Sequence, residues 1–195
     1  MSERLKDKVA IVVGAGSTPG DTLGNGRATS LLFAREGASV MLVDYRVDSA
    51  EETKEMIDAE GGRSFAFEAD ITRADDCKRM AEKCMETYGR IDILHNNVGI
   101  GEAGGPVELS EDDWERVINT NLKSAYLTCK YALPHMEKQG SGAIVNISSI
   151  AAVENYPWVA YKASKAAMVA FTRQLAIQNA EYGVRANVIL PGLMD

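Results

Sequence analysis

The chain has 195 residues, of which 46% are hydrophobic and 25% are charged, and its formal net charge at pH 7 is −7. This composition is typical of a soluble globular protein, and the length favours a single domain over residues 1–195. The acidic balance argues against nucleic acid as a partner, because a nucleic-acid surface is normally basic. No apolar run approaches the roughly 20 residues of a membrane span, so neither a membrane partner nor an export signal is expected.

Three cysteines, Cys77, Cys84 and Cys129, show no CxxC spacing. On one helix, Cys77 and Cys84 would lie roughly 10 Å apart, beyond the reach of a disulfide. Free thiols are typical of a reducing compartment, so the sequence predicts a cytoplasmic protein. His95 and His135 have no second ligand at a fixed spacing, so no metal site is predicted and both are expected to be structural.

Short apolar runs alternate with longer amphipathic segments along the whole chain. The runs predict buried strands at 9–13, 40–43, 64–68, 91–94, 143–147 and 184–190, of which 64–68 is the weakest. The segments predict helices at 26–36, 49–60, 74–88, 111–137 and 159–182. This alternation indicates an α/β fold with a Rossmann-like, doubly wound parallel sheet and helices on both faces.

The first predicted strand runs into a glycine-rich turn before the first predicted helix. Glycines let the backbone approach a pyrophosphate, and the N–H groups at the start of a helix stabilise its charge. The position of the turn predicts dinucleotide binding by Gly14, Gly24 and Gly26. Because glycine is common in any turn, an ordinary surface turn is the alternative.

Asp44 ends the second predicted strand, 18 positions after Gly26. A carboxylate there can accept hydrogen bonds from an adenosine ribose and repels a 2′-phosphate. NAD is therefore favoured over NADP, although Arg46 nearby leaves NADP open. A solvated aspartate at a strand end is the alternative interpretation.

Tyr161 and Lys165 have a Y-x-x-x-K spacing at the start of the last predicted helix. Residues four apart share a helix face, so the ammonium can lie beside the phenol. At about 4 Å and an effective dielectric of ~20, one ammonium stabilises a phenolate by roughly 4 kcal/mol. A phenol assisted in this way can act as a general acid or base. The same spacing also occurs by chance in helices where the tyrosine packs and the lysine is solvated.

Together the motifs resemble the short-chain dehydrogenase/reductase family over the whole chain. In chain order they are the glycine turn, Asp44, Asp70-Ile71, Asn96-Asn97-Val98-Gly99, Asn121, Asn146-Ile147-Ser148-Ser149, Tyr161 with Lys165, and Pro191-Gly192. The resemblance implies an oxidoreductase that transfers a hydride between NAD(P) and a small alcohol or ketone, and it implies a homodimer or homotetramer. A cofactor-binding sensor or scaffold without turnover is the alternative.

The resemblance also implies which residues lie along the cofactor. Asp70 and Ile71 would border the adenine, and Asn97 to Gly99 would follow the cofactor at the end of the fourth strand. Pro191 and Gly192 would pass beside the nicotinamide.

Four residues are implied to be catalytic: Asn121, Ser149, Tyr161 and Lys165. Asn121 would hold a water that connects Lys165 to solvent, and Ser149 would orient the substrate oxygen. Tyr161 would exchange the proton, while Lys165 would bind the nicotinamide ribose and stabilise the phenolate. A protein that only binds the cofactor has no need of this complete set.

Three features depart from the family pattern. Val13 replaces a threonine, and about six extra residues within 17–23, including Pro19 and Asp21, lengthen the glycine turn and are expected to form an ordered flap. Ser149 lies 12 positions before Tyr161 and Ser148 lies 13 before it, so Ser148 is the alternative to Ser149. The sequence stops soon after Pro191-Gly192, so a seventh strand and a C-terminal substrate lid are expected to be absent.

Overall fold

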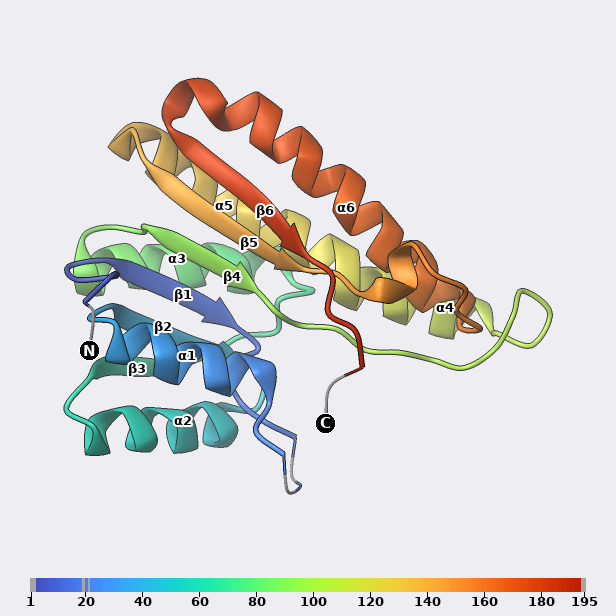
Figure 1. Ribbon diagram of the computed structural model, residues 1–195, viewed down its shortest axis with the longest axis horizontal. Helices are drawn as coiled ribbons and strands as arrows, with labels where there is room; N and C mark the ends of the chain where they lie inside the picture. Colours follow the sequence, from blue (N-terminus) through green and yellow to red (C-terminus); the bar gives the residue numbers. More distant parts are fainter. Residues whose placement is uncertain (1–2, 19, 21, 194–195) are drawn as a thin grey trace.

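A computed structural model describes residues 3–18, 20 and 22–193. In this part of the chain, six strands form one parallel sheet in the order β3-β2-β1-β4-β5-β6 (Figure 1). The strands are β1 (Val9–Val13), β2 (Ser39–Asp44), β3 (Arg63–Glu68), β4 (Ile93–Asn96), β5 (Gly142–Ile147) and β6 (Val184–Ile189). This order confirms the predicted Rossmann-like sheet. From β1 the chain adds strands on one side as far as β3, and from β4 it adds them on the other side as far as β6. Doubly wound sheets bind ligands at the point between β1 and β4 where the strand order reverses.

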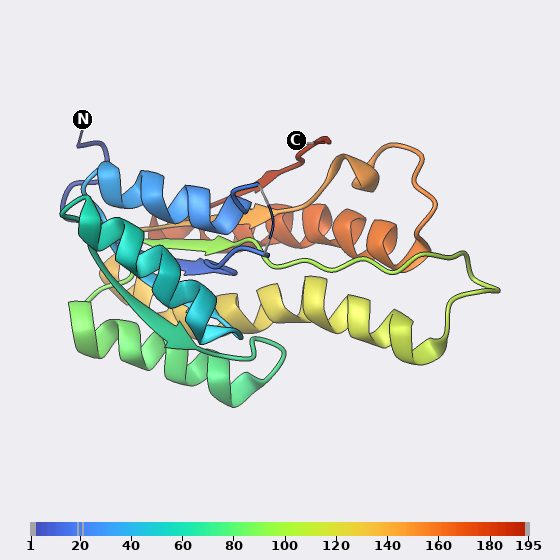
Figure 2. The same cartoon turned by 90° about the horizontal axis from the view of Figure 1, so that it is seen from below.

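Helices connect the strands on both faces of the sheet. They are α1 (Asn25–Arg35), α2 (Val47–Ala59), α3 (Ala74–Tyr88), α4 (Glu111–Ile118), α5 (Ser124–Gln139) and α6 (Val159–Asn179). A π-helical turn, η1 (Asn119–Lys123), joins α4 to α5, and two 3-10 turns are η2 (Ile150–Ala152) and η3 (Ala180–Tyr182). Figure 2 shows α1 on one side of the sheet and α3 and α5 on the other.

The buried side chains form two cores, one on each face. The smaller core lies between the sheet and helices α1 and α2. Val12, Val40 and Leu42 face it from the strands, and Leu31 and Ile57 face it from the helices. The intervening strand residues face the larger core, which α3, α5 and α6 cover. This two-sided burial explains why the strands are continuous apolar runs rather than alternating ones.

The strand predictions were correct in number and order, with one shift. The fourth strand begins at Ile93, two residues later than predicted, because Asp92 occupies the start of the strand. The carboxylate of Asp92 accepts the backbone N–H of Val9 at 2.9 Å and pairs with Arg90 at 2.7 Å. A side chain thus replaces part of the strand pairing at this end of the sheet.

The predicted continuous helix over 111–137 was wrong in one respect, because the π-helical turn Asn119–Lys123 interrupts it. The side chain of Asn121 in this turn bonds to the backbone of Ile100 and to Ser164. The apolar spacing continues on both sides of the turn, so periodicity alone could not reveal it. Such π-helical turns are frequent at functional sites.

No helix within the described ranges is long and apolar enough to cross a membrane. The three cysteines are free, as expected. They are also buried, and burial raises the pKa of each thiol to about 12.

His95 is buried on β4, on the same face as Val12. Its ring packs edge-on against Phe33 of α1 with the centroids 6.1 Å apart. Neither ring nitrogen has a hydrogen-bond partner among the described residues. Burial lowers the pKa of His95 to about 4, so the neutral form is strongly favoured in the folded protein.

Candidate active site

A cleft of about 1140 Å³ opens at the carboxyl ends of β1, β2 and β4. Eight of the residues predicted to bind the cofactor line it: Gly14, Gly24, Gly26, Asp44, Asp70, Ile71, Asn97 and Gly99. The cleft lies at the point where the strand order reverses, which is where a parallel sheet of this type binds ligands.

The glycine turn is held together by one close approach. A Cβ on Gly26 would lie 1.7 Å from the carbonyl oxygen of Gly14, so α1 can begin against the end of β1 only with glycine there. Gly14 itself has a positive φ of 76°, which favours glycine. Its carbonyl also accepts the side-chain N–H of Asn97 at 3.2 Å.

The backbone N–H groups at the start of the turn already have partners inside the protein. Those of Gly14 and Ala15 donate to the carbonyl of Val43, at 2.8 and 3.1 Å. The N–H of Gly16 donates to Asp44 Oδ2 at 3.0 Å. Helix α1, in contrast, begins after Gly24 with no side-chain cap. A pyrophosphate in the cleft would therefore meet the first turn of α1, whose N–H groups and dipole favour an anion.

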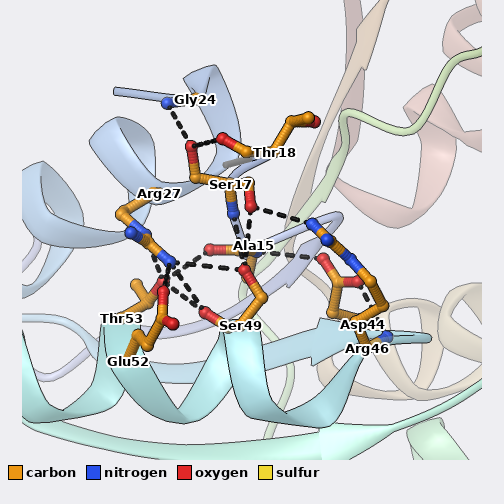
Figure 3. A network of polar contacts seen from close by, with 11 residues as sticks. Ala15, Ser17, Thr18, Gly24, Arg27, Asp44, Arg46, Ser49, Glu52 and Thr53 are labelled. Atoms are coloured by element: carbon orange, nitrogen blue, oxygen red, sulfur yellow. Dashed lines mark hydrogen bonds and ion pairs between the residues drawn. The ribbon is translucent and has the colours of Figure 1, made fainter. Parts of the chain in front are cut away.

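Ser17 ties the two ends of the lengthened turn together (Figure 3). Its hydroxyl accepts the N–H of Gly24 at 3.0 Å. Its backbone N–H donates to Ser49 Oγ at 2.9 Å, and its carbonyl accepts from Ser49 Oγ at 3.0 Å and from Arg46 Nη2 at 2.8 Å. We call these contacts of Ser17 with Gly24, Arg46 and Ser49 the Ser17 latch.

The sequence reasoning did not single out Ser17 or Ser49. The contacts between Ser17 and Ser49 join residues 32 positions apart, and no motif reveals that pairing. The described residues of the extension, 18, 20, 22 and 23, form no helix, while Pro19 and Asp21 of the predicted flap lie outside the described residues. The role of the predicted flap beside the pyrophosphate stays a prediction.

The latch leads to an expected result for two matched replacements of the extension. A Cβ on Gly24 would lie only 3.2 Å from Ser17 Cα, so two glycines in place of 18–23 can span the gap and leave Gly24 three positions after Ser17, where the Ser17 hydroxyl can still accept its N–H. This replacement should change the dissociation constant of NAD by less than threefold, whereas the same replacement combined with Ser17→Ala should raise it about tenfold, because the N–H of Gly24 then loses its partner. Calorimetric titration with NAD measures both values.

Thr22→Ala, an exposed position in the extension, serves as the control. A ten-fold loss of affinity when two glycines replace 18–23, in a protein with unchanged melting temperature, would show that the flap itself and not the latch supports the cofactor.

Asp44 combines two roles at the end of β2. While Oδ2 accepts the N–H of Gly16, Oδ1 accepts the N–H of Arg46 at 3.1 Å. The carboxylate still lines the cleft. The guanidinium of Arg46 bonds to the carbonyl of Ser17 and lies over the ring of Tyr45, 5.8 Å from its centroid. Its charge is thus directed at the turn.

Lys165 is buried beneath the inner end of the cleft, with 2% of its surface exposed. Its ammonium donates to the carbonyl of Ile147 at 2.9 Å and lies 5.6 Å from the centroid of the Tyr161 ring. A Cβ on Gly99 would lie 2.9 Å from Nζ. Burial lowers the pKa of Lys165 to about 8, because the low dielectric disfavours the charge.

Asn121 fixes the loop at the end of β4. Its Oδ1 accepts the N–H of Ile100 at 2.8 Å, and its Nδ2 donates to the carbonyl of Ile100 at 2.9 Å and to Ser164 Oγ at 3.0 Å. This placement next to Gly99 joins the cleft to the residues around Lys165. The expected water at Asn121 stays a prediction.

The structure distinguishes the two candidate serines. Ser148 is buried and its hydroxyl donates to the carbonyl of Lys165 at 2.7 Å, a contact that fixes β5 to α6. Ser149 precedes η2, and its hydroxyl oxygen accepts the N–H of Ala151 at 3.1 Å, which leaves its proton to donate. This geometry favours Ser149 over Ser148.

Pro191 and Gly192, which were also predicted to lie along the cofactor, follow β6. The carbonyl of Pro191 accepts the N–H of Ile150 at 2.9 Å, which brings the segment of Pro191 and Gly192 against the turn that follows Ser149.

The two motif asparagines without an assigned role, Asn96 and Asn146, bond to each other at 2.9 Å inside the sheet. They are buried and link neighbouring strands.

The comparisons with known proteins agree with this arrangement. A family model described as short chain dehydrogenase matches the chain over residues 8–195. The chain belongs to the short-chain dehydrogenase family. It is 36% identical to the 3-oxoacyl-[acyl-carrier-protein] reductase FabG of Thermotoga maritima over 98% of the chain and 76% of that protein. It is 35% identical to the cyclohexanol dehydrogenase of an Acinetobacter strain over 98% of the chain and 75% of that protein.

Two solved structures show the same fold for this family member. A putative short-chain dehydrogenase/reductase from Burkholderia xenovorans has a TM-score of 0.95 and 43% identity, covering 98% of this chain and 77% of that one. A 7α-hydroxysteroid dehydrogenase in complex with NADH and 7-oxo glycochenodeoxycholic acid has a TM-score of 0.90 and 34% identity, covering 98% and 72% of the two chains. The oxidoreductase family and the Rossmann fold are thereby established.

Proposed function

We propose that the protein transfers a hydride between NAD and a secondary alcohol or its ketone, with Tyr161 as the acid/base. One observation carries this proposal: the buried ammonium of Lys165 lies close both to Tyr161 and to the cleft that begins at Asp44. It is 5.6 Å from the centroid of the Tyr161 ring and 2.9 Å from a Cβ built on Gly99, which lines the cleft.

The residues of the cleft fit NAD. Its volume of about 1140 Å³ is large enough for a dinucleotide, and the uncapped start of α1 faces it. Asp44 can accept the hydroxyls of the adenosine ribose and opposes a 2′-phosphate. Arg46, which otherwise favours NADP, directs its guanidinium to the carbonyl of Ser17.

The proposed chemistry uses three side chains. NAD, when bound, supplies the hydride acceptor for the carbinol carbon of an alcohol. Ser149 donates a hydrogen bond to the substrate oxygen, and Tyr161 takes its proton. Lys165 stabilises the phenolate and would bind the nicotinamide ribose. In the ketone direction, charge develops on the substrate oxygen, so donors aimed there stabilise the transition state more than the ground state.

The test is turnover of a panel of secondary alcohols, followed by the absorbance of NADH, together with calorimetric titration of NAD and NADP. NAD-dependent oxidation of one of them supports the proposal. Tight binding of NAD without turnover of any alcohol or ketone would instead support the sensor or scaffold alternative.

Asp44→Ala is expected to weaken NAD binding by ten- to a hundredfold and to reduce the preference for NAD over NADP. The variant removes the ribose acceptor, and it also leaves the N–H of Gly16 without its partner. NADP should lose less, because the repulsion of its 2′-phosphate is removed at the same time. Titration with both cofactors measures the two changes.

Glu51→Ala, at an exposed position on α2, is the control for the general loss of negative charge. Arg46→Met separates the two cofactors further. If NADP binds the unmodified protein more tightly than NAD, and Arg46→Met abolishes that binding, the preference for NAD is wrong.

We also propose a homodimer or homotetramer that uses α5 and α6. Tyr126 on α5 and Ile177 on α6 are exposed apolar side chains, which is typical of a surface that another subunit covers. Light scattering after size-exclusion chromatography gives the oligomeric state, and a monomer at micromolar concentration would contradict the proposal.

A further inference from the structure

We infer that the substrate is a neutral ring alcohol or ketone, bound against an aromatic wall formed by Tyr156 and Trp158 beside Tyr161. The inference rests on the proposed function and names the substrate class of the same site.

The three rings contact one another at the start of α6. The centroids of Tyr156 and Tyr161 are 5.4 Å apart, and those of Tyr156 and Trp158 are also 5.4 Å apart. Trp158 meets Tyr161 edge-on at 6.3 Å. None of the three side chains is fully buried, so part of each ring stays free to contact a ligand next to Tyr161.

Contacts from both sides hold this wall in place. Gly101 packs against the Trp158 indole so closely that a Cβ would lie 2.5 Å from the ring. The N–H of Val159 donates to the carbonyl of Gly104 at 3.1 Å, which fixes the same loop to α6. Lys162 donates to two carbonyls of the segment before the wall, those of Ala151 at 3.0 Å and Glu154 at 2.5 Å.

The positively charged side chains near the wall already have hydrogen-bond or ion-pair partners. Lys162 bonds to those two carbonyls, and Lys165 is buried against Ile147. Arg116 pairs with Glu102 at 2.6 Å and with Asp113 at 2.9 Å. Among the described residues, these three cations are thus already paired or bonded. Arg116 is neutralised by its two carboxylates, and Lys162 and Lys165 would have to give up bonds to backbone carbonyls to hold a carboxylate or phosphate beside the reacting carbon.

The segment that leads to the wall exposes apolar side chains. Ile150 and Val153 are exposed at the turn that follows Ser149, and the exposed Glu154 and Asn155 follow them. A ring presents a flat apolar face to aromatic side chains and loses few rotatable bonds on binding, whereas an open chain of the same carbon number loses more conformational freedom. A rigid aromatic wall therefore favours the cyclic substrate.

The experiment compares three alcohols with NAD as the second substrate: cyclohexanol, 2-hexanol, and the N-acetylcysteamine thioester of 3-hydroxybutyrate. We expect kcat/KM for cyclohexanol to exceed that for each open-chain alcohol by at least tenfold. Trp158→Ala should lower kcat/KM for cyclohexanol about tenfold, mainly through KM, and should reduce the ratio of cyclohexanol to 2-hexanol. Trp114→Ala, which changes an exposed tryptophan on α4, should leave that ratio as it is.

Tyr156→Leu is the second variant, in case Trp158→Ala does not fold, and it should shift the ratio in the same direction. A higher kcat/KM for 2-hexanol or the thioester overturns the ring inference while hydride transfer stands. An unchanged ratio in a folded Trp158 or Tyr156 variant also overturns it. If none of these alcohols reduces NAD although NAD binds, the ring inference fails, and the wider panel of alcohols and ketones decides whether the proposed function fails with it.

Discussion

Tyr161→Phe is expected to lower kcat by at least about a thousandfold, within the range that general acid/base catalysis contributes. The variant removes the proton donor but keeps the ring contacts with Tyr156 and Trp158. The fold and the dissociation constant of NAD should therefore change little. NADH absorbance measures turnover, and calorimetric titration measures NAD binding.

Lys165→Met should also abolish turnover and weaken NAD binding, but it should make the protein more stable. Burial lowers the pKa of Lys165 from 10.5 to about 8, so its ammonium destabilises the folded state wherever it is protonated. The free energy of unfolding should rise with pH between about 8 and 10.5 in the unmodified protein, and this dependence should vanish in Lys165→Met. At pH 7 the gain is on the order of 3 kcal/mol, less the lost hydrogen bond to Ile147.

The double variant tests whether the two side chains act as one unit. Its loss of kcat should be far smaller than the product of the two single losses, because the second change removes a group that no longer has a partner. Lys162→Met is unsuitable as a control, since Lys162 bonds to the segment beside Tyr161, and Lys130→Met on α5 serves instead. Residual turnover of more than a tenth in Tyr161→Phe would contradict the mechanism.

Acid should destabilise the protein through His95. The pKa of His95 is about 4 in the folded protein and about 6.5 in an unfolded chain, so the unfolded state binds more protons between these values. The contribution of His95 to stability is complete above pH 6.5 and is lost as the pH falls toward 4, by about 1.4 kcal/mol per unit and on the order of 3 kcal/mol in all. Urea unfolding at pH 5, 6, 7 and 8 measures it.

His95→Leu should flatten this dependence and raise the stability at pH 5, because the leucine has no nitrogens to leave unpaired beside Phe33. His135→Gln on α5 controls for the other histidine. Equal pH dependence in the unmodified protein and in His95→Leu would show that other groups cause the acid sensitivity.

The sequence was sufficient to predict the sheet, because the strands are buried on both faces and appear as uninterrupted apolar runs. It also predicted most of the cleft, since Gly26 and Asp44 follow strands whose carboxyl ends must meet at one edge. The third helix was predicted with the bounds that the structure has, Ala74–Tyr88. Its apolar residues recur at helical spacing and Gly89 ends it in the left-handed conformation.

The remaining features depend on contacts between residues far apart in the chain. The π-helical turn follows from the bonds of Asn121 to Ile100 and Ser164, which leave the apolar periodicity unchanged. The different surroundings of Ser148 and Ser149 come from the bond of Ser148 to the carbonyl of Lys165, 17 positions away. The missing partners of His95 likewise cannot be seen in a strand pattern, where histidine looks like any other interior residue.

The Ser17 latch holds the start of α1 in place whatever the length of the glycine turn. Because Ser17 bonds to Gly24 directly, the two ends of the extension are held together independently of the residues between them. The closure entropy of such a loop grows only slowly with its length. The position between Ser17 and Gly24 is therefore a natural entry point for inserted peptides, and descendants of this chain can gain or lose residues there while the start of α1 keeps its place.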